Sequence, residues 1–203
     1  MMKSMESMHS SFYLQYVKVS SVYKGIPRLD VFREFCDNKK VLHIGCAGYP
    51  LTDPANNIHV ALAPHCERLD GYDLHTESYQ LLAPYIKNGC FLPNLENLEN
   101  YDIVIIPEVL EHIGNIEDFL GAMAEISAKR FVLTVPDLYQ CFAKHFEFND
   151  ERDLFAEAVH PDHNHWYSPY TIINTIKKYT PWEIEGLYWF NNISLLVSCS
   201  SKK

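Results

Sequence analysis

An unbroken apolar run, Ile103-Val104-Ile105-Ile106, constrains the fold of this chain more than any other feature of the sequence. A strand without polar alternation is buried on both faces, as in the middle of a parallel sheet. Similar runs occupy residues 41–44 and 131–135, and segments with apolar residues at helical spacing lie between the runs. This alternation predicts an α/β protein with a doubly wound, mostly parallel sheet and helices on both faces.

The two ends of the chain differ in how well they fit this pattern. Residues 182–190 and 193–199 are β-like runs joined by Asn191-Asn192, which predicts a closing hairpin. We expect one domain over residues 29–203. Residues 1–28 are interpreted as an N-terminal extension or lid, in which Tyr13, Tyr16 and Tyr23 form a flap or helix over the end of the sheet.

Composition narrows the classes of partner. The chain has 17 Lys and Arg against 26 Asp and Glu, a formal charge of −9, and its longest basic runs are pairs. An acidic surface repels phosphate backbones, so we expect no nucleic-acid partner and no anionic membrane partner. Six scattered cysteines without a CxxC pair favour reduced thiols. With no signal peptide and no apolar segment of about 20 residues, we expect a soluble, cytoplasmic protein.

Ligands of such sheets bind at the carboxyl ends of the strands, where the strand order switches. The small residues Gly45-Cys46-Ala47-Gly48 directly follow the run at 41–44 and leave room for a ligand against the main chain. Asp73 ends the second expected strand, where its carboxylate could accept hydrogen bonds from both hydroxyls of a ribose. A dinucleotide fingerprint requires another glycine at position 50, which is Pro50, so nicotinamide binding has little support.

Three segments in this order carry a family resemblance: residues 41–48, residues 71–73 and residues 101–112. Together they resemble the class I S-adenosylmethionine-dependent methyltransferases over about residues 38–200. The third segment, an aspartate and an apolar strand followed by Glu108-Val109-Leu110-Glu111-His112, is similar to the fourth-strand motif of that family. The resemblance implies a Rossmann-like sheet of seven strands, in which residues 193–199 form the antiparallel strand. It also implies S-adenosylmethionine as cofactor and S-adenosylhomocysteine as product.

The resemblance implies a set of cofactor-binding positions: Gly45, Cys46, Ala47, Gly48, Asp73, Leu74, Asn94, Leu95, Pro107 and Glu108. Asp73 would bind the ribose, and Asn94 and Leu95 would lie at the adenine. Four positions depart from the family. His43 stands where an acid is usual, Ala47 and Tyr49 stand where the loop usually has glycine, and Asn94 replaces an aspartate.

Histidines are the candidates for proton transfer, because imidazole titrates near neutral pH. We consider His112, His163 and His165 as catalytic residues, and each has a purely structural alternative. Residues 160–167, which hold three of the histidines together with Trp166 and Tyr167, are expected to form one wall of the acceptor site. We predict no metal site, because an H-x₂-H-x-H spacing in a loop does not place three ligands on one helical face.

The sequence therefore predicts an enzyme that transfers a methyl group to an oxygen or nitrogen atom of a small-molecule or sugar-like acceptor. Two alternatives stay open: a non-catalytic protein that binds S-adenosylmethionine, and a nicotinamide-dependent oxidoreductase on a similar fold. The identity of the acceptor and the choice between monomer and homodimer also stay open.

Overall fold

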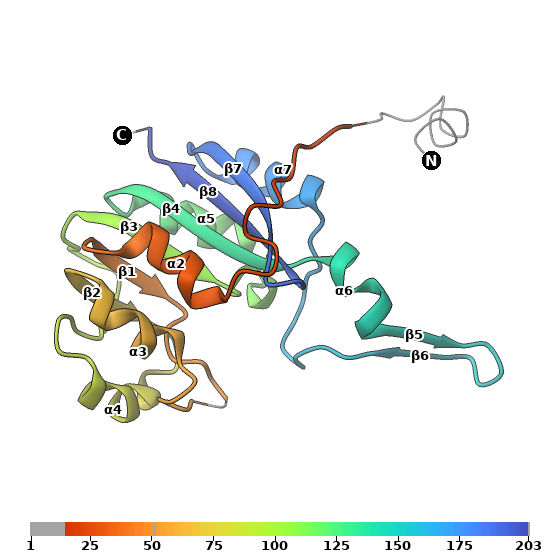
Figure 1. Cartoon of the computed structure of the whole chain (residues 1–203), viewed down its shortest axis with the longest axis horizontal. Coiled ribbons are helices and arrows are strands. Elements are labelled where there is room, and N and C mark those ends of the chain that lie inside the picture. Colours follow the sequence, from red (N-terminus) through yellow and green to blue (C-terminus); the bar gives the residue numbers. More distant parts are fainter. Residues whose placement is uncertain (1–14, 51, 203) are drawn as a thin grey trace.

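The computed structural model of the chain describes residues 15–50 and 52–202. Six strands of this part form one sheet in the order β2-β1-β3-β4-β8-β7 (Figure 1). Their bounds are β1 (Lys40–Ile44), β2 (Arg68–Tyr72), β3 (Tyr101–Pro107), β4 (Ala128–Pro136), β7 (Glu183–Phe190) and β8 (Ser194–Ser200). Strands β1 to β4 pair in parallel, and β8 pairs antiparallel with both β4 and β7. The mostly parallel sheet, the closing hairpin and the antiparallel strand near 193–199 are thereby confirmed.

The seventh strand of the implied sheet is reduced to a single parallel bridge between Gly71 and Phe91. The backbone around it still follows β2, because Gly71 N–H donates to the Cys90 carbonyl at 2.9 Å and Leu92 N–H donates to the Gly71 carbonyl at 2.8 Å. The ladder stops there because both backbone groups of Asp73 bond to the Tyr79 hydroxyl: Asp73 N–H donates to it at 2.6 Å, and it donates to the Asp73 carbonyl at 2.9 Å. The implied sheet of seven strands is therefore corrected to six, with a bridge at Phe91.

Helices cover both faces of the sheet, as the alternating pattern predicts. They are α2 (Arg28–Cys36), α3 (Ile58–Leu62), α4 (Tyr79–Leu82), α5 (Ile116–Glu125), α6 (Leu138–His145) and α7 (Pro169–Tyr179). Side chains cap the starts of α5 and α7: Asn115 accepts from Asp118 N–H at the start of α5, and Ser168 forms a capping box at the start of α7. Helix α4 ends early and continues as a 3₁₀ turn that contains Pro84.

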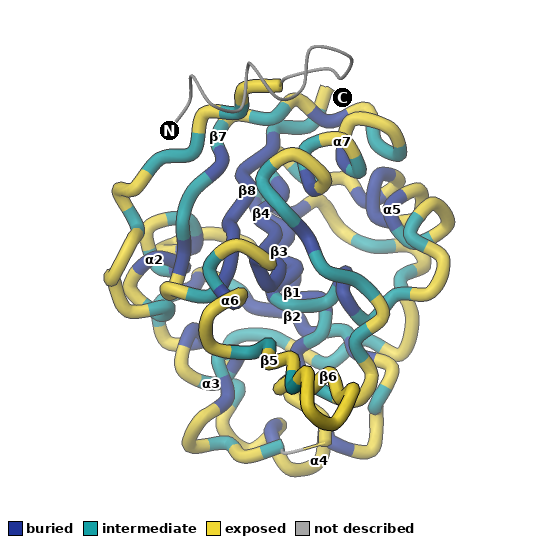
Figure 2. Tube along the Cα trace, turned by 90° about the vertical axis from the view of Figure 1, so that its right-hand side faces the viewer, coloured by how far each residue is buried: buried dark blue, intermediate teal, exposed yellow. Residues whose placement is uncertain are grey.

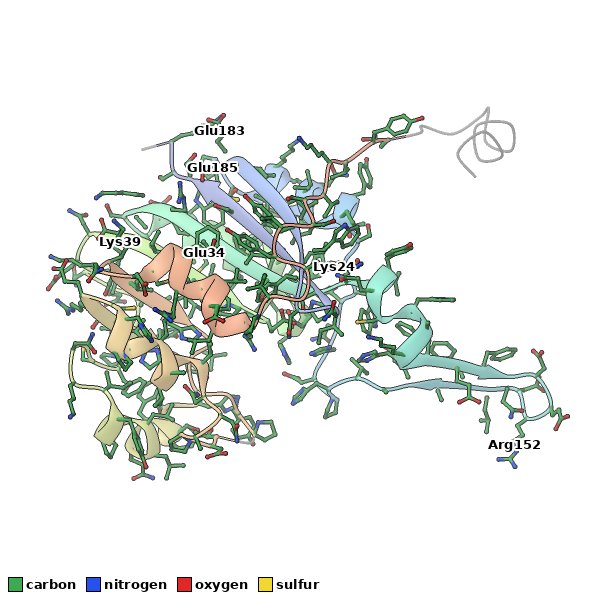
Figure 3. All side chains as sticks on the ribbon, in the orientation of Figure 1. Lys24, Glu34, Lys39, Arg152, Glu183 and Glu185 are labelled. Carbon is green, nitrogen blue, oxygen red and sulfur yellow. The ribbon has the colours of Figure 1, made fainter. Side chains whose placement is uncertain are left out.

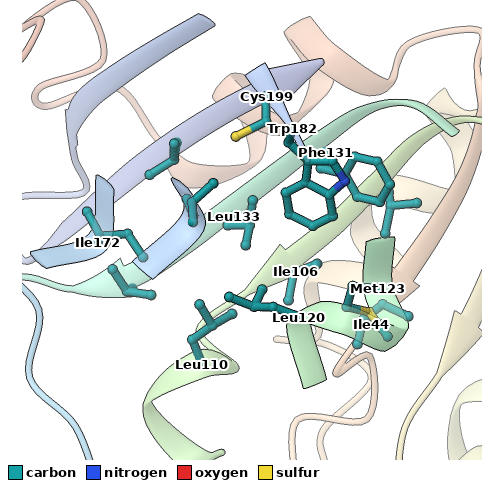
Figure 4. Packing of buried hydrophobic residues seen from close by; sticks show 14 of the residues in the cluster. Ile44, Ile106, Leu110, Leu120, Met123, Phe131, Leu133, Ile172, Trp182 and Cys199 are labelled. Atoms are coloured by element: carbon teal, nitrogen blue, oxygen red, sulfur yellow. The ribbon is translucent and has the colours of Figure 1, made fainter. Parts of the chain in front are cut away.

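The core consists of two hydrophobic clusters, one on each face of the sheet. Val104 and Ile106 of β3 belong to the cluster that includes α5 and α7, whereas Ile103 and Ile105 belong to the cluster that includes α2 and α3. The first cluster is shown in Figure 4. Both faces of β3 are buried, which explains its unbroken apolar sequence (Figure 2).

Residues 138–157 form an extension that the sequence pattern does not predict. Helix α6 leads into a two-stranded antiparallel ribbon of β5 (Phe146–Asn149) and β6 (Leu154–Glu157). The ribbon projects from the body of the protein, with Arg152 near its tip (Figures 1 and 3). Every residue of β6 is exposed.

The described part of the N-terminal extension, residues 15–27, contains no helix and runs along the sheet edge. Ser20 bridges to Tyr188 of β7, and the ring of Tyr23 packs 4.8 Å from that of Tyr188. Tyr23 therefore packs against the sheet edge and does not form the expected flap over the end of the sheet; Tyr16 is exposed, and Tyr13 lies outside the described residues. None of the helices in residues 15–50 and 52–202 is long and apolar enough to cross a bilayer.

Candidate functional site

A pocket of about 820 Å³ lies at the carboxyl ends of the first three strands. Its lining includes a residue that follows each of them: Gly45 after β1, Asp73 after β2 and Glu108 after β3. The strand order reverses between β1 and β3, which is the place where open α/β sheets bind ligands. The volume lies within the range of about 300–1,000 Å³ that is typical of small-molecule sites.

The turn after β1 depends on glycine. Gly45 has a φ of +77°, and a Cβ atom built on it would lie 2.5 Å from Cγ2 of Val109. Its N–H donates to the Tyr72 carbonyl at 2.8 Å, which fixes the turn to the end of β2. Cys46 and Ala47 are fully buried, so they support the floor of the pocket and lie outside its lining. Gly48, with a φ of +68°, lines the pocket as Gly45 does.

Asn57, which sequence reasoning missed, holds this glycine turn in place. Its Nδ2 donates to the carbonyls of Cys46 at 2.9 Å and Ala47 at 3.3 Å. Its Oδ1 accepts from Val60 N–H at 3.1 Å and so caps α3. The signal available in the sequence was an asparagine directly before a helical segment.

Asp73 joins the ends of β1 and β2. Its Oδ2 accepts from Ala47 N–H at 2.8 Å, and its Oδ1 accepts from His75 N–H at 2.9 Å. A carboxylate oxygen has two lone pairs, so each oxygen keeps acceptor capacity for a ligand. The carboxylate lines the pocket and is mostly buried, which strengthens hydrogen bonds to it.

The rim of the pocket is apolar and aromatic. Leu74 and Leu95 line it, and the rings of Tyr49 and His75 stack with their centroids 3.7 Å apart. Asn94 is not part of the lining within the described chain; its Oδ1 accepts from the backbone N–H of Glu96 in a local turn. The contact of Asn94 with adenine stays a prediction, and Leu95 is the member of the pair that lines the pocket.

His43, which departs from the family pattern, forms a buried pair with His59. Their Nδ1 atoms lie 3.2 Å apart, so one ring donates and the other accepts. Burial lowers the pKa of His43 well below its ordinary value and lowers the pKa of His59 to about 4. The pair is therefore neutral at pH 7 and links β1 to α3 behind the glycine turn.

Two carboxyl groups follow β3. Pro107 is buried at the end of the strand, and the next residue, Glu108, donates its N–H to the Thr134 carbonyl at 2.9 Å and lines the pocket. Glu111 is fully buried, and neither of its oxygen atoms is hydrogen-bonded by another described residue. Burial, followed by the neighbouring charge of Glu108, raises the pKa of Glu111 to about 9, so its carboxyl group is neutral at pH 7.

Three histidines from two distant parts of the chain come together beside these carboxyl groups. One ring nitrogen each of His112, His160 and His163, the histidine cluster, lies within 4.8 Å of one from each of the others. His112 and His160 line the pocket, whereas His163 lies behind them with a buried Nδ1 that has no partner in the described residues. Burial lowers the pKa of His163 to about 4 and lowers that of His112. The H-x₂-H-x-H spacing of the loop did not predict this cluster, because its third member, His112, lies in another part of the chain.

Residues 160–167, the histidine loop, form hydrogen bonds with the backbone of residues 111–113, which follow β3. Asn164 N–H donates to the Glu111 carbonyl at 2.7 Å, and Asn164 Nδ2 donates to the His112 carbonyl at 3.2 Å. His165 Nε2 lies 2.9 Å from the carbonyl oxygen of Ile113, to which it donates. These bonds hold the loop against the pocket.

The histidine loop supplies only part of the wall that the sequence predicts. His160, Pro161 and Asp162 line the pocket. His165 lies outside the lining because its ring is turned to the backbone, and Tyr167 is buried in the core. Trp166 donates its indole N–H to Glu157 at the base of the ribbon. Of the three candidate catalytic histidines, His112 therefore faces the pocket directly, and the expected roles of Trp166 and Tyr167 at the acceptor are corrected.

Comparisons with known proteins identify the fold. The chain is 24% identical over 190 residues to an N-methyltransferase 4 of Papaver somniferum and 26% identical over 102 residues to a ubiquinone biosynthesis O-methyltransferase of Rhodopseudomonas palustris. The matches cover 82% and 49% of this chain but only 52% and 39% of those proteins, so the chain spans about half or less of their length. No family model matches the sequence.

A solved structure agrees over most of both chains. The S-adenosylmethionine-dependent methyltransferase of Mesorhizobium loti superposes with a TM-score of 0.60 at 12% identity and covers 86% of this chain and 96% of its own. This protein therefore has the fold of the S-adenosylmethionine-dependent methyltransferases, with the pocket at the sheet edge where that fold leaves a switch in strand order.

Proposed function

We propose that the protein is an S-adenosylmethionine-dependent methyltransferase that acts on an oxygen or nitrogen atom of a small-molecule acceptor. The observation that carries this proposal is the convergence of Gly45, Asp73 and Glu108 around one pocket at the strand-order switch. The methyltransferase names of the curated relatives support the reaction class.

The residues at this edge fit the cofactor. The spare lone pairs of Asp73 suit ribose hydroxyls, and the glycine turn lets a ligand approach the main chain at Gly45, where a side chain would collide with Val109. Leu74 and Leu95 offer apolar surface for a purine. When bound, the cofactor supplies a methyl group already activated on a sulfonium.

The acceptor would lie on the opposite side of the pocket, against the wall of His112, His160 and Asp162. This wall combines imidazole rings with a carboxyl group, so it can hold a hydroxyl or amine and accept the proton that methylation releases. The other residues that line the pocket would orient the acceptor and exclude water. The formal charge of −9 favours an acceptor that is not a polyanion.

Calorimetric titration with S-adenosylhomocysteine and, separately, with NADH tests the cofactor assignment. We expect S-adenosylhomocysteine to bind the wild type and to bind Asp73→Ala about one to two decades more weakly, because a charged hydrogen bond contributes roughly 1.5–3 kcal/mol. Asp73→Asn keeps one acceptor and should fall between them. Asp30→Ala, which removes an exposed carboxylate of α2, is the matched control. Unchanged affinity in Asp73→Ala, or binding of NADH alone, would overturn the proposal.

Turnover separates an enzyme from a protein that only binds the cofactor. Labelled S-adenosylmethionine is incubated with the protein and with pools of small phenols, alcohols and amines. Release of S-adenosylhomocysteine that depends on one acceptor supports transfer. Tight cofactor binding with no acceptor-dependent release from any pool would favour the non-catalytic alternative.

A further inference from the structure

The histidine cluster has the composition of a metal site. We propose that His112, His160 and His163 bind one divalent transition-metal ion, such as Zn²⁺ or Co²⁺, with a fourth coordination position open to the pocket. Neutral imidazole is a preferred ligand of these ions, and three protein ligands with one open position are typical of catalytic rather than structural sites.

The distances between the ring nitrogens of the three histidines are longer than in a metal-bound site, so the rings must move closer together when an ion binds. Zn–N bonds of about 2.0–2.1 Å in a tetrahedral site hold ligand nitrogens about 3.3 Å apart, so nitrogens within 4.8 Å of one another must approach by up to about 1.5 Å. His160 and His163 both lie on the histidine loop, where small rotations of the rings supply this movement. The main chain between them is already turned, because His163 N–H donates to the His160 carbonyl at 3.0 Å.

Groups around the cluster orient two of the rings. Asp162 Oδ2 lies 3.3 Å from His112 Nδ1, which leaves Nε2 of that ring for a metal. Glu111 Oε1 lies 4.0 Å from His163 Nε2, which leaves the buried, unpartnered Nδ1. A carboxyl group facing the far nitrogen of a ligating histidine is the usual arrangement in metal sites, where it fixes the ring.

Buried polar atoms without partners at the cluster also support the site. Both oxygens of Glu111 and Nδ1 of His163 have no hydrogen-bond partner in the described residues. Buried polar atoms without partners are costly, and each requires an explanation such as an ion. A metal bound by His163 would satisfy its Nδ1 and draw its Nε2–H toward Glu111. His160 would exchange a long hydrogen bond, 3.2 Å from Asp162 N–H to its Nδ1, for a ligand bond.

The position of the ion implies a class of acceptor, and this step rests on the proposed function. His112 and His160 line the pocket, so the open position faces it and would take water or an acceptor hydroxyl. A metal-bound hydroxyl loses its proton to solvent water at a lower pH than a free one. Its oxygen then forms the new C–O bond as the C–S bond of the sulfonium breaks, and the metal keeps its oxidation state. The acceptor is therefore a hydroxyl compound, and the reaction is O-methylation.

Titration of the full chain with CoCl₂ after dialysis against a chelator tests the site without any methyl transfer. We expect one equivalent of Co²⁺ to bind, with the visible absorption of tetrahedral Co²⁺. His160→Ala and His163→Ala should bind at least about 10²-fold more weakly, because loss of a ligand costs more than loss of an orienting group. His65→Ala is the control, since His65 precedes β2 at the opposite edge of the sheet. Circular dichroism and the melting temperature verify that each variant is folded.

The outcome separates this inference from the proposed function. Absence of stoichiometric Co²⁺ binding, or equal affinities in His160→Ala and His65→Ala, would overturn the metal site even if S-adenosylhomocysteine binds. Metal binding that depends on the cluster, together with no affinity for S-adenosylhomocysteine, would uphold the site and overturn the methyltransferase proposal. Methyl transfer confined to amines would remove the hydroxyl step and leave the metal site in place.

Discussion

A single added methyl group at Gly45 should perturb the whole edge of the sheet. Two features of Gly45 make Gly45→Ala destabilising: its φ of +77°, and the 2.5 Å that would separate the new Cβ from Val109 Cγ2. A left-handed conformation costs about 1–2 kcal/mol outside glycine, and the collision with Val109 adds to that cost. We expect urea unfolding to give a free energy of unfolding lower by about 2 kcal/mol or more, and calorimetry to give weaker S-adenosylhomocysteine binding.

Gly121 is the matched control for this prediction. It lies inside α5, and a Cβ atom there would meet nothing within 4 Å. Gly121→Ala should stabilise the protein by about 0.5–1 kcal/mol, because alanine favours a helix interior over glycine. If both substitutions had equal effects, the close approach at Gly45 would not be a determinant of this turn.

Single residues could be predicted where one motif specifies them and not where distant segments meet. Asp73, Gly45 and Glu108 follow strands, so strand ends alone place them at one edge. His112 and His160 are 48 positions apart, and no spacing rule relates them. The local turn at Asn94 was not predicted for a similar reason, because it depends on backbone geometry that residue type does not reveal.

At the start of α3, Asn57 has two roles: it caps the helix, and it donates hydrogen bonds to the glycine turn. Two substitutions of Asn57 separate these roles. Asn57→Ala removes the cap and the bonds to the Cys46 and Ala47 carbonyls, so it should destabilise the protein by about 1–2 kcal/mol and weaken S-adenosylhomocysteine binding. Asn57→Asp keeps the acceptor for Val60 N–H but loses both donations.

We therefore expect Asn57→Asp to weaken S-adenosylhomocysteine binding as much as Asn57→Ala does or more, since its carboxylate would face two carbonyl oxygens. Thermal unfolding and calorimetry on the two variants measure the two effects. Wild-type affinity in Asn57→Asp would show that the turn does not depend on the amide.

The contact between β1 and α3 should make stability depend on pH. Burial lowers the folded-state pKa of His59 to about 4, below its ordinary value of 6.5, so the unfolded chain takes up a proton first as the pH falls. Stability is fully present above about pH 7 and is lost through the window from about 6.5 to 4. Between about pH 7.5 and 5, this residue should lower the free energy of unfolding by about 2 kcal/mol.

Urea unfolding at the two pH values measures this effect. His59→Asn keeps a hydrogen-bonding group toward His43, whereas His59→Phe does not, and neither side chain titrates. Both variants should therefore show a pH dependence that is weaker by a similar amount. An unchanged dependence in both would mean that His59 is not buried in its neutral form.

Elements were predictable where burial gives the sequence a period. The strands at 41–44, 103–106 and 131–135 are buried and were identified from their apolar runs. The ribbon of β5 and β6 was not, because side chains such as Phe148 and Phe155 are exposed on both strands and no face is apolar by period. Burial, the physical basis of the pattern, is absent there.

At the scale of the whole molecule, the ribbon and the sheet should be separable. Residues 147–156 pair mainly with one another, whereas Phe146 and Glu157 at the base contact Trp166. Replacement of 147–156 by a short Gly-Ser turn should leave the melting temperature within about 4 °C, corresponding to less than about 1 kcal/mol. S-adenosylhomocysteine affinity should not change. A large loss of affinity would place the ribbon in the function of the pocket.

The architecture as a whole followed from alternation, since a chain of buried strands separated by helices has few ways to bury both faces of its sheet. The sheet has six strands and not seven because the Tyr79 hydroxyl bonds to both the N–H and the carbonyl of Asp73, where pairing between β2 and residues 90–92 would continue. The position of the pocket followed from the same topology. Strands β1 and β3 are neighbours, and the strands that follow them, β2 and β4, lie on opposite sides of this pair, which makes it the switch point.

A crystal structure grown with S-adenosylhomocysteine would test whether the pocket at the strand-order switch binds the cofactor. We expect density for one molecule in the pocket, with the ribose hydroxyls within hydrogen-bond distance of Asp73, the homocysteine end against Gly45 and Glu108, and the purine beside Leu95. Density for the ligand elsewhere, or an empty pocket at saturating ligand, would contradict it.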